Sequence, residues 1–374
     1  MANKAERYQR HELIDWFPQQ AVHDAKVAVI GCGAVGNEVA KNLALLGVGH
    51  IDLYDFDTIE IHNLTKSVLF REDDVGELKV NVARQRLMEL EPNIMVNAYH
   101  GDVWDLLNFE LLESYSCVLC CVDNYETRIK LNRLCLLSKI PFINTGIDSK
   151  YCQVEVYPFG KDRYCACYEC SLPITVYEKV QERYSCGWLK KVAFEEKKIP
   201  TTIITSSITG SLATSFAMGL IKGSSNANTT RILQNSMTGQ SFVSTIDRNE
   251  QCPCCSGISA NPIIMSGGRE ILQLGGSIGN GCDTLVTSSE PIIVSAECTI
   301  CGQKNELVEL TKASDSNSNL IWCAGCKTES VLVQIKDYFT LQELKDNHIN
   351  KSFPGKFVQV QIHGKTVIIE LRDS

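Results

Sequence analysis

The run Gly31-Cys-Gly33-Ala-Val-Gly36 constrains the fold of this chain more than any other feature of its sequence. It follows a short β-branched stretch, residues 26–30, and opens a stretch with helical spacing at residues 37–46. In such a strand–turn–helix unit the glycines permit the tight turn, the close approach of a phosphate and the packing of helix on strand. The helix N-terminus also offers unpaired N–H groups to an anion. The sequence therefore predicts a nucleotide-binding turn.

Strands and helices continue to alternate after this turn. Further strands are expected at residues 50–54, 117–122 and 141–144, and further helices at residues 77–90 and 125–137. This alternation predicts an α/β fold with a Rossmann-like, doubly wound parallel sheet. Asp55 ends the second strand, 19 residues beyond Gly36, where a carboxylate can bind ribose hydroxyls. The fingerprint by itself favours NAD as much as ATP.

Length, composition and charge narrow the class of protein. A chain of 374 residues suggests two or three domains, and 44% apolar with 21% charged residues is ordinary for a soluble protein. A net charge of −8 argues against nucleic acid as a partner. The start has no secretory signal, and Thr, Ser and Gly interrupt the apolar run at residues 203–220. We expect a cytoplasmic protein with reduced thiols and no membrane span.

Eighteen cysteines in a reduced protein point to metal binding. Two Cys-x-x-Cys pairs far apart in sequence each have the spacing of one edge of a zinc tetrahedron; they are Cys167 with Cys170 and Cys252 with Cys255. Cys165 and Cys254 lie beside them, so the choice of ligands has some ambiguity. Two further pairs, separated by 21 residues, have zinc-ribbon spacing; they are Cys298 with Cys301 and Cys323 with Cys326. We expect two closed, structural Zn²⁺ sites.

Four more motifs carry a family resemblance: RYQRH near the start, DFDTIEIHNL after the second strand, VGELKV, and CCVDNYETR after a later strand. Together they resemble the ThiF/MoeB/ubiquitin-activating superfamily of E1-like adenylating enzymes, from about Arg7 to Cys255. The resemblance implies ATP and Mg²⁺ as cofactors and a set of nucleotide-binding residues, namely Gly31, Gly33, Gly36, Asp55, Asp57, Asn63, Lys66, Lys79, Asp123 and Asn124.

The resemblance also implies individual roles. Asp55 would bind ribose, Asn63, Lys79 and Arg10 would contact phosphates, and Asp123 would hold magnesium. The arginine at Arg10's position usually enters the partner subunit's site, which implies a homodimer. The family pattern Asn-Leu-x-Arg-Gln is changed here to Asn63-Leu-Thr-Lys66-Ser67, which loses the bidentate fork of arginine.

The chemistry of these residue types agrees with adenylation. A carboxylate that attacks an α-phosphate needs cations on the phosphate oxygens and on the leaving pyrophosphate, and hydride transfer needs none. Taken singly, Lys79 could be an exposed helix lysine and Arg10 a surface charge. Only the shared motif context favours the catalytic interpretation.

Cys186, in RYSCGWLKK, belongs to no Cys-x-x-Cys pair. The segment from Cys170-Ser-Leu-Pro to Cys186-Gly-Trp resembles the crossover loop of thioester-forming activating enzymes, in which this cysteine would attack the acyl-adenylate. Nearby Arg183, Lys190 and Lys191 would lower its pKa if they lie close in space. Alternatively, Cys186 is incidental, as in family members that stop at adenylation.

The sequence thus predicts three segments. Residues 1–256 form the adenylation domain with a crossover loop at 171–200 and a zinc knuckle. Residues 257–290 form a linker or loose loops, and residues 291–374 form a small α+β zinc-ribbon module with a candidate partner-binding tail. The predicted reaction is adenylation of the C-terminal glycine carboxylate of a ubiquitin-like protein, thioester formation and transfer to a conjugating enzyme. One alternative is adenylation of a sulfur-carrier protein without conjugation, and another is an NAD-dependent oxidoreductase.

Overall fold

The computed structural model describes residues 7–160, 165–182, 200–223, 228–266, 285–305, 311–312, 322–340, 342, 355–362 and 365–372. The chain divides into two compact units. The first unit comprises Met1–Leu172 with Lys197–Ser256, and the second unit comprises Pro173–Glu196 with Gly257–Ser374.

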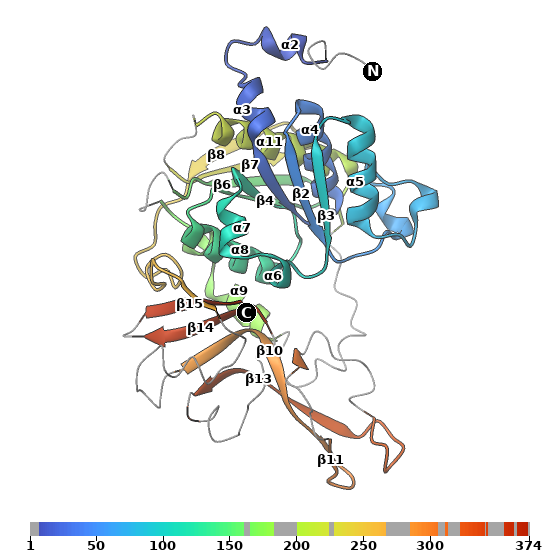
Figure 1. The fold of residues 1–374 in the computed structure, drawn as a ribbon, viewed down its shortest axis with the longest axis vertical. Coiled ribbons are helices and arrows are strands. Elements are labelled where there is room, and N and C mark those ends of the chain that lie inside the picture. The colour runs from blue at the N-terminus through green and yellow to red at the C-terminus, as the bar shows by residue number, and fades with distance from the viewer. Residues whose placement is uncertain are drawn as a thin grey trace. The chain divides into compact units, whose positions relative to one another are not determined.

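An eight-stranded sheet forms the centre of the first unit, in the order β3-β2-β1-β4-β5-β6-β7-β8 (Figure 1). The strands are β1 (Lys26–Ile30), β2 (His50–Asp55), β3 (Met95–His100), β4 (Cys117–Cys120), β5 (Phe142–Ile147), β6 (Tyr151–Tyr157), β7 (Thr230–Asn235) and β8 (Ser241–Thr245). The strands β3, β2, β1, β4 and β5 pair in parallel, and β6, β7 and β8 extend the sheet in antiparallel pairs. The predicted Rossmann-like α/β fold is confirmed.

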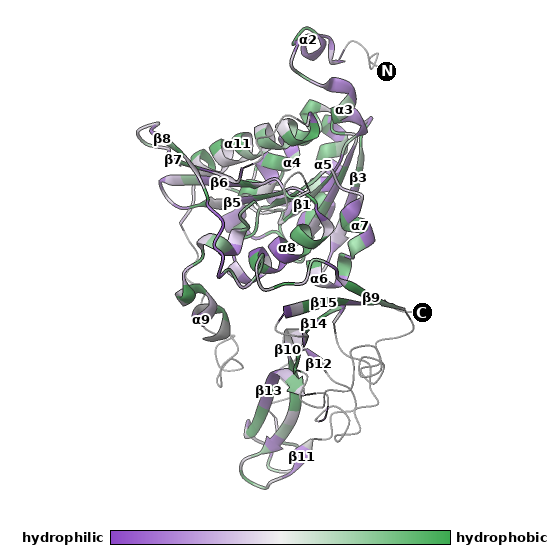
Figure 2. Ribbon diagram, turned by 90° about the vertical axis from the view of Figure 1, so that its left-hand side faces the viewer, coloured by the Kyte–Doolittle hydropathy of each residue, from purple (hydrophilic) through white to green (hydrophobic). Residues whose placement is uncertain are grey.

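Helices cover both faces of this sheet (Figure 2). One face carries α4 (Ala34–Leu46), α5 (Lys79–Leu90) and α11 (Ile203–Ile221), and the other carries α6 (Val103–Leu106), α7 (Phe109–Glu113) and α8 (Tyr125–Ser138). The short helices α2 (Gln9–Glu12) and α3 (Gln19–Asp24) precede β1. Three 3₁₀ turns are η1 (Ile61–Asn63), η2 (Glu72–Asp74) and η3 (Tyr168–Ser171). Helices on both faces bury the parallel strands, which explains why the central strands β1 and β4 are almost wholly apolar.

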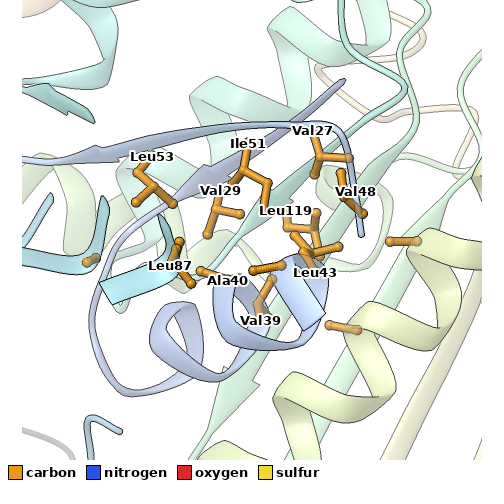
Figure 3. Packing of buried hydrophobic residues seen from close by; sticks show 14 of the residues in the cluster. Val27, Val29, Val39, Ala40, Leu43, Val48, Ile51, Leu53, Leu87 and Leu119 are labelled. Carbon is orange, nitrogen blue, oxygen red and sulfur yellow. The ribbon is translucent and has the colours of Figure 1, made fainter. Parts of the chain in front are cut away.

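One hydrophobic core of the first unit lies between the sheet and the helices α4, α5 and α11 (Figure 3). Val27 and Val29 of β1 point toward Val39 and Leu43 of α4, and all four side chains are fully buried. Burial of side chains of this size stabilises the fold by about 1.5–3 kcal/mol each. This packing fixes the start of α4 against the end of β1, and therefore fixes the glycine turn between them.

Helix α11 contains the apolar run at residues 203–220, in which small residues are interspersed with large ones. By length and composition it could cross a membrane, with a mean hydropathy of 1.3, but half of that window is buried within the structure. Ala213 and Ala217 lie in the core of the first unit, and the Ser207 hydroxyl donates to the Glu38 carboxylate of α4 at 3.0 Å. A Cβ at Gly210 would lie 2.5 Å from Glu38 Cβ, so the missing side chain permits this close approach. These contacts favour the interpretation as a buried core helix.

The second unit is built around a seven-stranded sheet with the path β11-β10-β14-β15-β9, to which β12 and β13 add by pairing with β10. Its strands are β9 (Ile263–Ser266), β10 (Leu285–Cys298), β11 (Lys304–Asn305), β12 (Thr311–Lys312), β13 (Val331–Thr340), β14 (Phe357–Ile362) and β15 (Lys365–Arg372), and its helix is α9 (Ile174–Glu182). Strand β9 and the first residues of β10 lie within the range 257–290 that was expected as linker or loose loops. The apolar residues of β9 pair in parallel with β15, which gives that segment a place in the sheet.

Candidate nucleotide site and metal centres

The strand order of the first unit creates a topological switch point between β1 and β4. From β1 the chain adds β2 and β3 on one side, and then returns to place β4 on the other side of β1. In open α/β sheets, ligands bind outside the carboxyl ends of the strands at such a point. Gly31 and Cys121 directly follow β1 and β4, and Asp55 is the last residue of β2, so the glycine turn lies at this position.

The three glycines of the turn have three different surroundings. Gly31 has φ +92°, and a Cβ there would lie 2.9 Å from the Cys121 carbonyl oxygen. At Gly36 a Cβ would lie only 1.9 Å from the Gly31 carbonyl oxygen, so α4 can pack here only without a side chain. At Gly33 a Cβ would meet nothing within 4 Å. Gly33 therefore faces open space at the N-terminus of α4, where a phosphate can approach.

This difference between Gly36 and Gly33 predicts that one alanine substitution affects stability and the other affects ATP binding. Gly36→Ala is expected to destabilise the protein by roughly 2–5 kcal/mol, because the new methyl group collides with backbone. Gly33→Ala is expected to leave the thermal midpoint almost unchanged and to weaken ATP binding. Thermal unfolding and ATP titration of both variants check this, and a stable Gly36→Ala protein would contradict the assigned packing.

Asp55 holds the turn from the end of β2. Its carboxylate accepts one hydrogen bond from the Cys32 backbone N–H at 2.6 Å and another from the Asp57 N–H at 2.8 Å. Burial raises the pKa of Asp55, and the nearby Lys79 ammonium counteracts that shift in part. The Cys32 side chain is itself buried.

Lys79 is the first residue of α5, and only 8% of its surface is exposed. Its Nζ lies 2.6 Å from Asp57 Oδ2. Burial lowers the pKa of Lys79, but the carboxylates of Asp55 and Asp57 outweigh that effect and raise the pKa above its usual value. Lys79 is therefore a buried, fully charged cation beside the glycine turn, and the alternative of an exposed helix lysine is excluded.

Asn63 and Lys66 lie in the segment that follows β2. Asn63 is buried at the end of η1, where its side-chain oxygen accepts the Glu60 N–H at 2.9 Å and its amide nitrogen lies 3.2 Å from His62 Nε2. Lys66 Nζ donates to the Thr201 hydroxyl at 3.4 Å. In this structure the Asn63 amide and the Lys66 ammonium therefore both form hydrogen bonds with other protein groups.

Asp123 and Asn124 follow β4 at the carboxyl edge of the sheet. The Asn124 side chain caps α8 by accepting the Thr127 N–H at 2.8 Å. The Asp123 side chain is exposed, and within the described part of the chain the structure gives its carboxylate no hydrogen bond or ion pair. An exposed carboxylate beside a phosphate-binding turn suits Mg²⁺, which usually binds one or two protein carboxylates together with substrate phosphates.

Arg10 lies on α2, at the opposite edge of the sheet from the glycine turn. Tyr8, which directly precedes α2, packs on Gly47 and donates to Glu91. Gly47 and Glu91 come shortly before the first residues of β2 and β3, so α2 lies near the amino ends of these strands. Strands of five or six residues separate the two edges by about 17–20 Å at about 3.3 Å per residue. The structure therefore does not bring Arg10 to the glycine turn of its own chain.

Two polar residues that were not singled out from the sequence support the site. Asn37 donates to the carbonyl oxygens of Cys32 at 2.7 Å and Gly33 at 3.1 Å, and accepts the Leu69 N–H at 3.0 Å. Arg128 donates to the Val122 carbonyl oxygen at 2.6 Å, just before Asp123. Their signals were an asparagine directly after the glycine run and an arginine at the end of CCVDNYETR.

The first cysteine cluster belongs to the first unit and comprises Cys167, Cys170, Cys252 and Cys255, whose Sγ atoms all lie within 4.8 Å of one another. The Sγ atoms of Cys170 and Cys255 are 3.4 Å apart, those of Cys167 and Cys252 3.6 Å, and those of Cys167 and Cys170 3.9 Å. A tetrahedral Zn²⁺ with Zn–S bonds of about 2.3 Å requires S···S edges of about 3.8 Å, so the donor set fits zinc. Cys254 does not belong to this group of four, and its Sγ accepts the Asn132 side-chain amide at 3.4 Å.

The second cysteine cluster belongs to the second unit and comprises Cys298, Cys301, Cys323 and Cys326. Cys298 and Cys326 are 3.8 Å apart, and Cys301 and Cys323 are 3.7 Å apart, again near a tetrahedral edge. The N–H groups of Ile300 and Cys326 each donate to a cluster sulfur at 3.4 Å. Such bonds favour the thiolate form that metal binding needs. Both predicted four-cysteine groupings are therefore brought together.

Cys186, the candidate nucleophile, lies outside the described residues. Its role stays a prediction from the sequence.

Together, the glycine turn at a switch point and the buried acid–lysine group define a nucleotide-binding α/β protein, which also carries a four-cysteine cluster whose geometry fits zinc. Residues 7–254 match the ThiF family, and the chain belongs to that family. The family resemblance found in the sequence is confirmed.

Three similar proteins illustrate the family. The chain is 36% identical to SUMO-activating enzyme subunit 2 of Dictyostelium discoideum over 156 residues, 41% of this chain and 23% of that protein. It is 34% identical to molybdopterin-synthase adenylyltransferase of Salmonella typhimurium over 167 residues, 44% of this chain and 66% of that protein. A crystal structure of Escherichia coli MccB with AMPCPP and MccA has a TM-score of 0.55 at 25% identity, covering 68% of this chain and 75% of MccB. The chain thus spans less than two thirds of both curated relatives.

Proposed function

We propose that this protein activates the C-terminal carboxylate of a small ubiquitin-like or sulfur-carrier protein by ATP-dependent adenylation. A carboxylate oxygen of the carrier's C-terminal glycine attacks the α-phosphorus of ATP. The bond between that phosphorus and the oxygen that bridges to the β-phosphate breaks, so that pyrophosphate leaves and an acyl-adenylate remains.

One observation carries the proposal: a buried cation, a ribose-type acid and an open glycine turn meet at the β1–β4 switch point. Gly33 and the N-terminus of α4 offer N–H groups and space to the phosphates. Asp55 is placed to accept ribose hydroxyls, because its two oxygens each accept one backbone N–H and keep further lone pairs. Lys79 holds a positive charge where negative charge develops on the phosphate oxygens.

Asp123 is the residue that would hold Mg²⁺, and Asn124, as the cap of α8, orients the segment that carries it. The bound ion would neutralise charge on the phosphates.

The position of Arg10 supports a homodimer in which each site is completed by the partner subunit. Because Arg10 lies at the amino edge of its own sheet, its guanidinium can assist phosphate chemistry only at another chain's carboxyl edge. An arginine placed beside the reacting phosphate stabilises the negative charge that develops there in the transition state.

The step after adenylation is where the two carrier classes diverge. In the first version Cys186 attacks the acyl-adenylate, expels AMP and keeps the carrier as a thioester for a conjugating enzyme, for which the second unit would provide a recruiting surface. In the second version the acyl-adenylate passes to a sulfur donor. Similarity to a molybdopterin-synthase adenylyltransferase supports this second candidate. Both versions place the protein in the reducing cytoplasm, where the cluster thiolates can hold zinc.

ATP–pyrophosphate exchange against a panel of small proteins ending in glycine tests the proposal. We expect exchange that depends on one such protein and stops when its last glycine is removed. NADH binding without any exchange would instead support the oxidoreductase alternative. With a productive carrier, a reducible enzyme–carrier adduct that disappears in Cys186→Ala would select the thioester version.

A further inference from the structure

We propose that Tyr8 and Glu91 form a clamp that holds α2 against the end of α5, so that Arg10 is presented rigidly to the partner subunit. The inference rests on the proposed function, because it assumes that Arg10 acts at the partner's nucleotide site. It adds two positioning residues that do not touch substrate themselves.

The clamp is a buried, charge-assisted hydrogen bond. The Tyr8 hydroxyl donates to Glu91 Oε2 at 2.7 Å, and the Glu91 side chain is completely buried. Arg7 pairs with the same carboxylate at 2.5 Å and also donates to the Leu90 carbonyl oxygen at the end of α5. The other Glu91 oxygen accepts the backbone and side-chain N–H groups of Asn93 at 2.9 and 2.7 Å. Glu91 therefore joins the N-terminal segment to the turn after α5.

The ring of Tyr8 is also held sterically. Its hydroxyl end packs on Gly47, where a Cβ would lie 2.6 Å from two ring-end atoms of Tyr8. Gly47 has φ +83° and ends α4, so the same glycine that terminates the helix leaves the space for the tyrosine. Burial and the bond to Glu91 both raise the pKa of Tyr8, so the hydroxyl stays protonated and donates throughout the physiological range.

The clamp lies two residues before Arg10 in the chain. Arg10 is exposed, and among the residues that the structure describes it has no hydrogen bond or ion pair of its own. An arginine that must reach another subunit loses effect when its backbone moves, because misplacement of a charged group by about 1 Å can cost about 100-fold. A buried bond at Tyr8 is a direct means of fixing that backbone, and four-residue α2 has too few turns to hold itself in place.

The test uses subunit complementation in full-length proteins. Two differently tagged chains are co-expressed, and heterodimers are purified through both tags and assayed for exchange. An R10A/D123A heterodimer keeps one site with an intact Asp123 and an intact Arg10 from the other chain, so about half of the wild-type rate is expected. The R10A/D123A heterodimer is the reference. If it is inactive, Arg10 does not act at the partner subunit's site, and the role proposed for the Tyr8–Glu91 clamp is wrong as well.

Tyr8→Phe and Glu91→Gln are then paired with each reference chain. A Y8F/D123A heterodimer should keep about half of the wild-type rate, because its working site receives an unaltered α2. In a Y8F/R10A heterodimer the only arginine available comes from the unclamped α2, so the rate should fall about tenfold below that, as expected for loss of one charge-assisted bond. E91Q should follow the same pattern. Equal rates in both pairings, with the R10A/D123A reference active, would overturn the clamp and leave the proposed function standing.

Discussion

Replacing Lys79 with methionine is expected to lower ATP–pyrophosphate exchange by about 10²–10³-fold, the effect of removing one preorganised charge from a phosphate or oxyanion site. Methionine keeps much of the side-chain volume, so α5 should still pack on the sheet. The Asp55 and Asp57 carboxylates would then lie beside the phosphates with no cation between them. Their repulsion adds a loss of ATP affinity to the loss of turnover.

Two companion variants separate the charge of Lys79 from its packing. Lys79→Arg keeps the positive charge and should retain more exchange than Lys79→Met, although the guanidinium fits a site shaped for an ammonium poorly. Lys150→Met removes an exposed lysine of the same unit and should leave exchange unchanged. If Lys79→Met exchanged pyrophosphate within about threefold of the unmodified protein, Lys79 would have no role at the phosphates.

The nucleotide site was predictable from sequence because its parts are local. The glycine turn joins neighbouring elements, and its acid, Asp55, lies at the end of the next strand, so chain order places them together whenever the strands are parallel. Lys79 was predicted through family resemblance, and its pairing with Asp57 follows from two segments, 22 residues apart, that meet only in the folded protein. Periodicity gave no signal for that pair.

Other features required the folded structure. Strand β3 carries polar residues such as Asn97, whose amide joins the buried Asp52 of β2 at 2.8 Å, so its apolar alternation is weak. The position of Arg10 at the amino edge of the sheet could not be predicted from RYQRH. It depends on the hydrogen bond between Tyr8 and Glu91, which are 83 residues apart in sequence. Likewise, spacing left Cys254 open as a ligand, and only the folded structure shows which four sulfurs lie together without it.

The first cysteine cluster is predicted to stabilise the nucleotide site as well as its own loop. Glu169, between two cluster cysteines, pairs with Arg133 of α8 at 2.7 Å, and Asn132 of α8 accepts the Tyr168 N–H at 2.9 Å. Helix α8 begins directly after Asp123 and Asn124. Loss of the metal would release the segment around Cys167 and Cys170, and α8 would then lose its contacts with Tyr168 and Glu169.

Cys252→Ser is therefore expected to bind one zinc ion per chain instead of two, to unfold at least about 10 °C lower, and to lose exchange in parallel. Cys254→Ser is the matched control two residues away. Its hydroxyl can still accept the Asn132 amide, so zinc content should stay at two and the thermal midpoint should fall by only a few °C. Zinc analysis, thermal unfolding and exchange assays on both variants give the answer. If Cys254→Ser loses a zinc ion and Cys252→Ser keeps both, the ligand assignment is wrong and Cys254 is the ligand. Only the loss of a sulfur that binds the ion should lower the zinc content.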